Sequence, residues 1–441
     1  MLVFESKSSK LAIAGAKIAT PVPSGPARPL DDSIENNSVI AIKSDDTRHV
    51  HSLGYYPSKF IPEIPRWAID QWSSPGDIVM DPYIGSGTTA VESVIAKRSS
   101  IASDISPWAA LLTRAKTTRA QPDDIRDAAA HLVSRIQRRD FPDAAPPEFE
   151  LSSFWFAEPH LNEFARIREL IETDAPKNLR EFFLAVAAST IRYFSYQDQA
   201  QIKVKRDPKK VLLGTPSPSD LFVGRVGSMV DRLISFNEKA AGSLASSTSF
   251  VSSATNLSFV SPQSVDLVVT SPPYINAMNY PMASRYELLL LGLVSDGTLH
   301  AHQATYHGSE RVYARDYRAV SQVDKAWNTA EYLNPRLQAI YASEPKRAHI
   351  AQQYFQGMHS ALTEIHDKLR NGGRLVLVVG TNVIRSVPID TFAVLRNMTL
   401  DMGMEDELTF HYEIVKQAFK LTRHRTANII PHDGVAVMVK R

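Results

Sequence analysis

Residues 78–89 have the sequence Ile-Val-Met-Asp-Pro-Tyr-Ile-Gly-Ser-Gly-Thr-Thr. The three apolar residues at its start predict a short buried strand that ends at Asp81. Gly85 and Gly87 allow a tight turn and bring the backbone close to a ligand, and the helix predicted from Thr89 presents free amide N–H groups to that ligand. This order of strand, glycine-containing loop and helix is typical of the ligand-binding edge of a doubly wound α/β sheet.

The segments on either side continue the alternation of helix and strand. Trp67 to Trp72 predict an apolar helix face before the loop, and Ser100 to Ser103 predict a strand after it that ends in Asp104. Between residues 121 and 240 apolar residues recur at helical spacing. Further strands are predicted at Val265–Val269, Arg374–Val379 and Gly434–Val439. We therefore expect one α/β sheet domain that is interrupted by a helical insert.

The composition is that of a folded chain of 441 residues, with 44% hydrophobic and 22% charged residues. It contains no apolar run of the roughly 20 residues that a membrane helix needs and no signal-peptide pattern, so we expect a cytoplasmic protein without membrane contact. The absence of cysteine excludes disulfides, thiolate metal sites and the cysteine nucleophile that cytosine-C5 methylation requires. The thirteen histidines show no metal-ligand spacing, so no metal is expected. Because the net charge is only +2, any nucleic-acid surface must be a local basic patch.

Two classes of ligand fit the glycine-containing loop. With Ala90 the loop matches the loose G-x-G-x-x-A pattern of nicotinamide dinucleotide enzymes, and Asp104, 19 residues after Gly85, stands where an acid binds ribose hydroxyls. Asp81 favours a methionine-type cofactor instead, because a carboxylate ahead of the glycines can bind a cationic ammonium group but repels a pyrophosphate.

The strand predicted at Val265–Val269 leads directly into Thr270-Ser271-Pro272-Pro273-Tyr274. Two successive prolines stiffen the chain, so this loop presents hydrogen-bond acceptors from fixed positions. The exocyclic amine of a nucleobase is a poor nucleophile, because its lone pair is delocalised into the ring, and acceptors on both N–H bonds draw it toward tetrahedral geometry. The Ser271 hydroxyl and the Pro272 carbonyl can supply these acceptors. The ring of Tyr274, rather than its hydroxyl, can stack on a base flipped out of a duplex. The predicted catalytic residues are Ser271, Pro272, Pro273 and Tyr274.

These segments resemble those of a known family. Val269 to Tyr274 is similar to the signature of cytosine-N4 DNA methyltransferases, and Asp81 to Thr89 resembles the S-adenosylmethionine loop of the amino-methyltransferase superfamily. His51 to Pro62 resembles the segment that closes over the methionine end of that cofactor, and Ser103 to Pro107 resembles the motif whose acid holds its ribose. One departure is Ser252-Ser253-Ala254, where the family often has Gly-Asp-Ala.

The resemblance implies a Rossmann-like class I methyltransferase fold, with a mixed, mostly parallel sheet, and S-adenosylmethionine as cofactor. It implies site-specific methylation of the N4 amine of a flipped cytosine in double-stranded DNA, in restriction-modification or phage defence with a cognate restriction endonuclease as partner. Adenine-N6 methylation stays open, since enzymes of that type usually have Asp where this chain has Ser271. An RNA base methyltransferase and a catalytically silent DNA-recognition subunit are further alternatives. The implied cofactor-binding residues are Lys59, Asp81, Pro82, Tyr83, Gly85, Ser86, Gly87, Thr88, Thr89, Asp104 and Ile105.

A basic run places five positive charges within eight residues, at Lys203, Lys205, Arg206, Lys209 and Lys210. Such a run either contacts DNA phosphates or forms a solvated loop, and a base-modifying site elsewhere in the chain favours DNA contact. The expected organisation is an N-terminal extension (1–48), a cofactor-binding half (49–120), a helical insert for target recognition (121–250), a catalytic half (251–300), a second, DNA-contacting insert (301–353) and the C-terminal part of the sheet (354–441).

Overall fold

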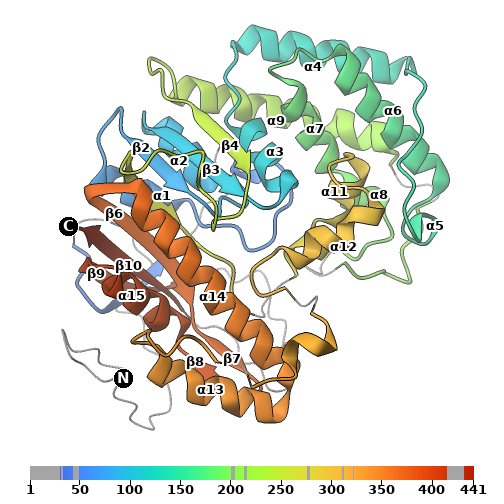
Figure 1. Cartoon of the computed structure of the whole chain (residues 1–441). Coiled ribbons are helices and arrows are strands. Elements are labelled where there is room, and N and C mark those ends of the chain that lie inside the picture. Colours follow the sequence, from blue (N-terminus) through green and yellow to red (C-terminus); the bar gives the residue numbers. More distant parts are fainter. Residues whose placement is uncertain are drawn as a thin grey trace.

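The computed structural model describes residues 30, 33–42, 49–199, 204–212, 216–275, 279–309, 312–320, 322–414 and 432–441. Its centre is an eight-stranded sheet in the order β1-β9-β10-β6-β5-β2-β3-β4 (Figure 1). Only β10 runs antiparallel to its neighbours, β6 and β9, and the other neighbouring pairs are parallel. The expected mixed, mostly parallel α/β sheet is therefore confirmed. The strands are β1 (Ser38–Ile42), β2 (Ile78–Asp81), β3 (Ser99–Asp104), β4 (Ser247–Val251), β5 (Val265–Thr270), β6 (Leu369–Gly380), β9 (Met404–Ile414) and β10 (Asp433–Lys440).

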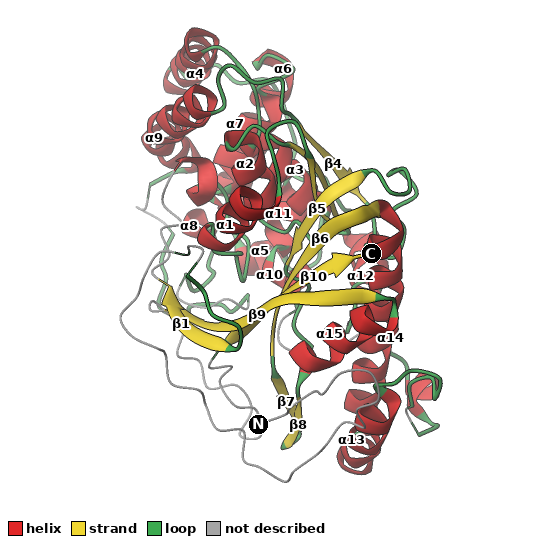
Figure 2. Cartoon of the chain, turned by 90° about the vertical axis from the view of Figure 1, so that its left-hand side faces the viewer, coloured by secondary structure: helices red, strands yellow, loops and turns green. Residues whose placement is uncertain are grey.

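Helices cover both faces of the sheet (Figure 2). The first face packs against α13 (Ala330–Ser343), α14 (Pro345–Lys368) and α15 (Thr391–Asp401), and the second against α1 (Glu63–Trp72), α2 (Thr88–Ile95) and α3 (Pro107–Lys116). Along β6 the side chains alternate, so that Leu375 and Leu377 join the core of the first face and Val376 joins that of the second. A strand buried on both faces reads as a continuous apolar run, and this explains why β6 could be predicted from the sequence.

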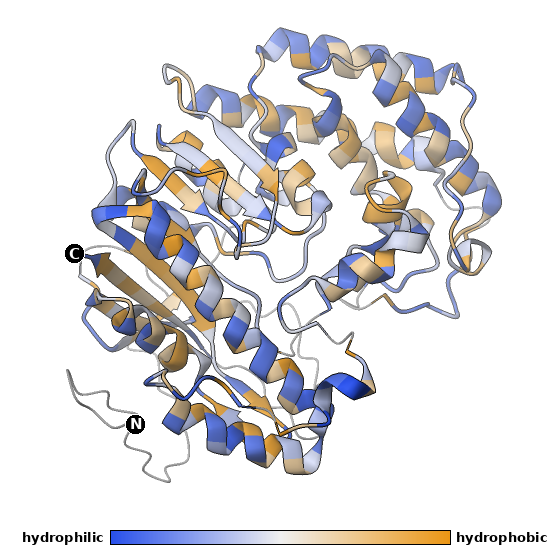
Figure 3. Ribbon diagram, viewed as in Figure 1, coloured by the Kyte–Doolittle hydropathy of each residue, from blue (hydrophilic) through white to orange (hydrophobic). Residues whose placement is uncertain are grey.

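The helical insert forms a separate lobe beside α3. Its predicted apolar stripe is buried, with Leu132 at 0% exposure, and it shares one core with Phe182, Phe183 and the later Leu288. In Figure 3 the strands are largely orange, whereas the helices of the lobe carry blue residues toward solvent. The lobe comprises α4 (Pro122–Gln137), α5 (Ser152–Trp155), α6 (Glu158–Asp174), α7 (Arg180–Ala188), α8 (Ile191–Phe194) and α9 (Pro218–Lys239), joined by α11 (Arg285–Leu290).

Three strands of the sheet were not predicted. β4 has the sequence Ser-Thr-Ser-Phe-Val, lies at one edge of the sheet and contains no buried residue, so it lacks the apolar run of a central strand. β1 lies in the expected N-terminal extension and pairs with β9 at the other edge. These edge strands can be recognised only from their pairing with a neighbouring strand, which the structure shows. The smaller elements are α10 (Tyr280–Ala283), α12 (Asp296–Ala304), the hairpin β7 (Asn382–Ile384) and β8 (Val387–Ile389), and two 3-10 turns at His49–Ser52 and Ala314–Tyr317.

The strand order reverses direction at β2. The chain passes from β2 to β3 on one side, while β5 and β6 lie on the other. Doubly wound sheets bind ligands at such a reversal, outside the carboxyl ends of the strands. Asp81 ends β2, Asp104 ends β3 and Thr270 ends β5, so the two motifs predicted from the sequence meet at this edge. None of the helices in the described ranges is both long and apolar enough to cross a membrane.

Candidate functional site

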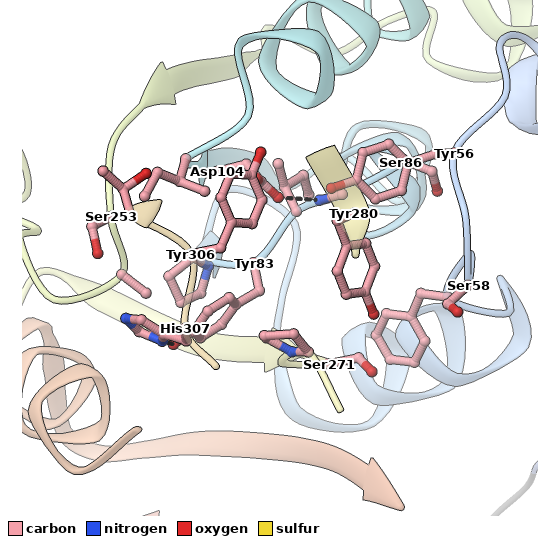
Figure 4. Close-up of a pocket in the computed structure, with 18 residues that line it drawn as sticks. Tyr56, Ser58, Tyr83, Ser86, Asp104, Ser253, Ser271, Tyr280, Tyr306 and His307 are labelled. Atoms are coloured by element: carbon pink, nitrogen blue, oxygen red, sulfur yellow. Dashed lines mark hydrogen bonds between the residues drawn. The ribbon is translucent and has the colours of Figure 1, made fainter. Parts of the chain in front are cut away.

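A cleft of about 720 Å³ opens at the carboxyl ends of β2, β3 and β5 (Figure 4). It brings together residues of the glycine loop (residues 81–89) and of the proline loop (residues 270–274). The predicted site residues that line the cleft are Pro82, Tyr83, Gly85, Ser86, Asp104, Ile105, Ser271 and Pro273.

The glycine loop needs its glycines for two physical reasons. Gly85 and Gly87 have φ of 50° and 83°, in the left-handed region that residues with a side chain rarely adopt. A Cβ on Gly87 would also lie 3.1 Å from Cα of Thr113 in α3, and a Cβ on Gly85 would lie 3.0 Å from the ring of Tyr56. The loop therefore packs tightly on α3 behind it and leaves its backbone facing the cleft.

Asp104 lies in the wall of the cleft as predicted. One carboxylate oxygen accepts a hydrogen bond from the Gly85 amide at 3.0 Å, and the other accepts from the Ser106 amide at 2.8 Å. Burial raises the pKa of Asp104 to about 6, although these hydrogen bonds act in the opposite direction. Each carboxylate oxygen can accept more than one hydrogen bond, so the group can still bind hydroxyls of a ligand in the cleft.

Asp81 lies beneath the cleft rather than in its wall. Its carboxylate accepts hydrogen bonds from the Thr89 hydroxyl and the Thr270 hydroxyl, both at 2.7 Å, and from the Tyr83 amide at 3.0 Å. Burial raises its pKa to about 6. The structure thus gives Asp81 the task of joining the glycine loop to the proline loop, and its contact with a cofactor ammonium group stays a prediction.

The proline loop presents two of its predicted residues to the cleft. Ser271 and Pro273 line the wall, and Pro272 is buried behind them. Tyr274 is partly buried and does not line the cleft; its hydroxyl donates a hydrogen bond of 2.9 Å to the carboxylate of Asp433. The sequence assigned the role of Tyr274 to its ring alone and missed this partner.

An aromatic wall of the cleft was also missed. Tyr306 and His307, from the expected second insert, face Tyr83 of the glycine loop, whose hydroxyl lies 3.0 Å from Nδ1 of His307. Burial lowers the pKa of His307, which favours its neutral form. In Figure 4 these rings lie near Ser253, and Ser271 lies toward the other end of the cleft. The sequence places both residues in the insert expected to contact DNA, and no local pattern marks either of them as part of the cleft.

The remaining predicted cofactor residues support the loop from behind. The Thr88 hydroxyl lies 2.9 Å from that of Ser86 and donates to the Phe60 carbonyl, and Thr89 binds Asp81. Lys59 donates to the His51 carbonyl at 3.2 Å. A fully buried residue that the sequence did not indicate, Lys116, donates to the Ser86 carbonyl at 2.7 Å. These contacts fix the shape of the loop, and a direct cofactor contact by Lys59, Gly87, Thr88 or Thr89 stays a prediction.

The basic run divides into two kinds of residue. Lys210 donates to the backbone carbonyls of Arg192 and Gln197, and burial lowers its pKa. The Arg206 guanidinium lies 4.5 Å from the centre of the Phe154 ring and 4.4 Å from that of Tyr196. Lys205 and Lys209 are exposed, and Lys203 lies outside the described residues. Two of the five cations therefore help to hold the fold, and DNA contact by the run stays a prediction. No cluster of metal-ligating side chains occurs in the part of the chain that the structure describes.

Comparison with known proteins relates the chain to the DNA methylases. Residues 32–113 match the model of the N6/N4 methyltransferase family, described as DNA methylase. The chain is 21% identical to the type II methyltransferase M.MvaI of Kocuria varians over 407 residues, which are 86% of this chain and 87% of that protein. It is 38% identical to the type II methyltransferase M.MjaII of Methanocaldococcus jannaschii over 95 residues, 22% of this chain and 18% of that protein. A solved S-adenosylmethionine-dependent methyltransferase from Methanosarcina mazei aligns with a TM-score of 0.31 and 11% identity, over 88% of this chain and 99% of that one.

These matches relate the chain to DNA methyltransferases of the N6/N4 type, whose cofactor is S-adenosylmethionine. The family model covers both kinds of amine and does not distinguish cytosine N4 from adenine N6.

Proposed function

We propose that this protein is a site-specific DNA methyltransferase, which transfers a methyl group from S-adenosylmethionine to the N4 amine of a cytosine flipped out of duplex DNA. One observation carries the proposal. Ser271 and Pro273 of the proline loop line the same cleft as Gly85 and Asp104, which the sequence predicts to bind the cofactor. The proposed acceptor site for an amine and the proposed site for a methyl donor therefore share one cleft.

The residues of the cleft fit this cofactor. Asp104 offers carboxylate oxygens to ribose hydroxyls, and the Ile105, Tyr306 and His307 side chains offer flat or apolar surfaces to an adenine ring. Ser253 lies at that end of the cleft, and Ser271 lies toward the other, where the methionine part would place its sulfonium. When bound, S-adenosylmethionine supplies an electrophilic methyl group.

The proline loop activates the amine by accepting its protons in hydrogen bonds. The Ser271 hydroxyl and the Pro272 carbonyl are held by a stiff backbone, and Thr270 ties this backbone to Asp81 under the glycine loop. Fixed acceptors stabilise the positive charge that develops on nitrogen as it attacks, without reorganising during the reaction. The ring of Tyr274, which follows Pro273 and lies outside the lining of the cleft, is the proposed stacking surface for the flipped base.

Cytosine is proposed over adenine because position 271 is Ser, the residue that the resemblance associates with N4 methylation. The type II methyltransferases to which the chain is similar support a role in restriction-modification, with double-stranded DNA as substrate and a cognate restriction endonuclease as partner. Adenine N6 is the second candidate, since the same acceptor geometry serves either amine.

Nucleoside mass spectrometry tests the proposal directly. DNA from a bacterial host without DNA methyltransferases of its own is compared after expression of the wild type and of Ser271→Ala. We expect N4-methylcytosine with the wild type only. N6-methyladenine as the sole product would overturn the assignment of cytosine but not that of methyl transfer to DNA. If the protein is folded and binds the cofactor but no methylated base is found, the proposed reaction is wrong. Single-molecule sequencing of the same DNA would map the target site.

A further inference from the structure

Asp433, the first residue of β10, accepts hydrogen bonds from two tyrosines. Tyr274 of the proline loop donates to one carboxylate oxygen at 2.9 Å, and Tyr412 of β9 donates to the other at 3.2 Å. The two phenols approach the carboxylate from opposite sides of β10 in the strand order, since Tyr274 follows β5 and Tyr412 lies in β9. Asp433 is therefore the link between the catalytic loop and the antiparallel part of the sheet.

The register of the sheet explains how Tyr274 reaches a strand that is not its neighbour. Asp433 is opposite Tyr412 on β9 and opposite Gly380, the last residue of β6. β6 lies between β5 and β10, and at this level it carries a residue without a side chain. The Tyr274 side chain can thus pass the end of β6 and place its hydroxyl against the carboxylate.

The hydrogen bond to Asp433 constrains the aromatic ring of Tyr274, which is the part that would stack on a base. Fixing the hydroxyl at one end and Cα at the other, after two prolines, fixes the long axis of the tyrosine ring. Because a phenol O–H prefers the plane of its ring, the hydrogen bond also restricts rotation of the ring about that axis. Hydrogen bonds to a carboxylate are stronger than those between neutral groups, so the orientation is held firmly. Burial raises the pKa of Asp433, and the two phenol hydrogen bonds lower it.

We propose that Asp433 is a positioning residue for the target base, which acts by holding the ring of Tyr274 through its hydroxyl. The inference rests on the proposed function, because it assigns Tyr274 the task of stacking on the flipped base. It assigns no contact between Asp433 and DNA or cofactor. Tyr412 makes the same kind of bond to the same carboxylate but has no part in the proline loop, so it provides a matched control.

The experiment uses the full-length protein and compares Tyr274→Phe, Asp433→Ala, the double variant and Tyr412→Phe. Methylation of a duplex that carries the mapped target site gives kcat and KM for DNA, and calorimetry gives the affinity for S-adenosylmethionine. A second duplex carries 2-aminopurine in place of the target base, and its fluorescence reports the unstacked base held in the site. Thermal unfolding shows whether each variant is folded.

We expect Tyr274→Phe and Asp433→Ala each to lower kcat/KM for DNA by about tenfold, because a hydrogen bond to a charged group is lost in each. The 2-aminopurine signal should fall in both, and cofactor affinity should not change. The double variant should lose no further kcat/KM beyond Tyr274→Phe, since both changes remove the same Tyr274–Asp433 bond and the Tyr412 bond that Asp433→Ala also removes has no part in the proline loop. The kcat/KM of Tyr412→Phe for DNA should stay within about twofold of the wild-type value.

Equal losses for Asp433→Ala in the wild-type and Tyr274→Phe backgrounds would overturn the inference, because Asp433 would then act by another route. Equal losses for Tyr412→Phe and Tyr274→Phe would overturn it too, since the carboxylate would then serve the sheet rather than the proline loop. If Tyr274→Phe is as active as an active wild type, this inference is wrong but the proposed function stands. A wild type that methylates no DNA defeats the proposed function and this inference together.

Discussion

Thr270, the last residue of β5, donates a hydrogen bond of 2.7 Å from its hydroxyl to the carboxylate of Asp81, the last residue of β2. The same carboxylate accepts from Thr89 and from the Tyr83 amide, so one buried group joins the two loops that line the cleft. Neither loop can shift without disturbing the other. We therefore expect the proposed cofactor binding and amine binding to be coupled through Asp81, which lies outside the cleft.

Thr270→Val tests this coupling. Valine keeps the shape of threonine but cannot donate, and a lost hydrogen bond to a charged group costs about 1.5–3 kcal/mol. We expect the free energy of unfolding in urea to fall by about that amount, and the affinity for S-adenosylmethionine to fall with it. Thr248→Val, at an exposed position of the edge strand β4, is the matched control and should change neither. If Thr270→Val is destabilised but its affinity for S-adenosylmethionine is unchanged, the two loops are not coupled in cofactor binding.

Cofactor affinity should depend on pH through Asp104. Burial raises its pKa to about 6, and ribose hydroxyls that donate to the carboxylate favour its charged form. Binding should therefore release a proton near pH 6, so that affinity rises with pH through this range and levels off above it. Calorimetry in two buffers of different ionisation enthalpy measures how many protons are released on binding.

Asp104→Asn is the control for that measurement, because Asp81 also has its pKa raised to about 6. The variant should bind more weakly and show no proton release. Proton release that persists in Asp104→Asn would assign the titration to Asp81. Affinity that does not vary between about pH 5 and pH 7 in the wild type would remove Asp104 from the cofactor site.

Ser271→Ala should separate binding from chemistry. The loss of one fixed acceptor in a preorganised site costs roughly 3 kcal/mol, so methyl transfer should slow by about 100-fold or more. Cofactor affinity should stay at the wild-type value, since the Gly85 and Asp104 side of the cleft is untouched. Ser258→Ala, at an exposed loop position, should behave as the wild type. A fully active Ser271→Ala would exclude the acceptor mechanism.

We expect the exposed and the partly buried lysines of the basic run to have different functions. Lys205 and Lys209 are exposed, so changing both to Ala should weaken DNA binding and lower the log-log salt slope by up to about two units, roughly 0.9 per lost phosphate contact. Lys210→Ala should instead lower the free energy of unfolding, because its ammonium group holds two backbone carbonyls. Salt titrations and urea unfolding distinguish the two effects. A salt slope unchanged in the double variant would mean that the run is a solvated loop.

The sequence predicts the middle of this molecule better than its edges. β2, β5 and β6 are apolar runs because helices cover both of their faces, and a continuous apolar run is visible without knowledge of neighbours. β4 is polar and lies at the edge, so its residues carry little hydrophobic signal. The amphipathic helices of the insert were predicted for a different reason, since burial of one helix face imposes a regular spacing of apolar residues.

The site divides in a similar way. The glycine loop and the proline loop are each formed by consecutive residues, so both could be predicted, and residues of both line the cleft. Tyr306 and His307 reach the cleft from more than 200 positions beyond the glycine loop, and Asp433 from 159 positions beyond Tyr274. No spacing rule connects such residues, because the sheet order brings them together. The role of Asp81 as a joint between loops likewise depends on Thr270, which only the structure places beside it.

The antiparallel β10 lies between β6 and β9 in the sheet, although it follows every other described strand in the chain. Until residues 433–440 are made, β6 and β9 each have an unpaired edge in the nascent chain, and Tyr274 has no Asp433 to bind. Pairing of β10 therefore closes this part of the sheet and gives Tyr274 its partner in the same event, and a chain without β10 has two open strand edges there. Truncation at residue 431 is expected to give aggregated protein rather than a weaker enzyme, because exposed strand edges pair with other chains.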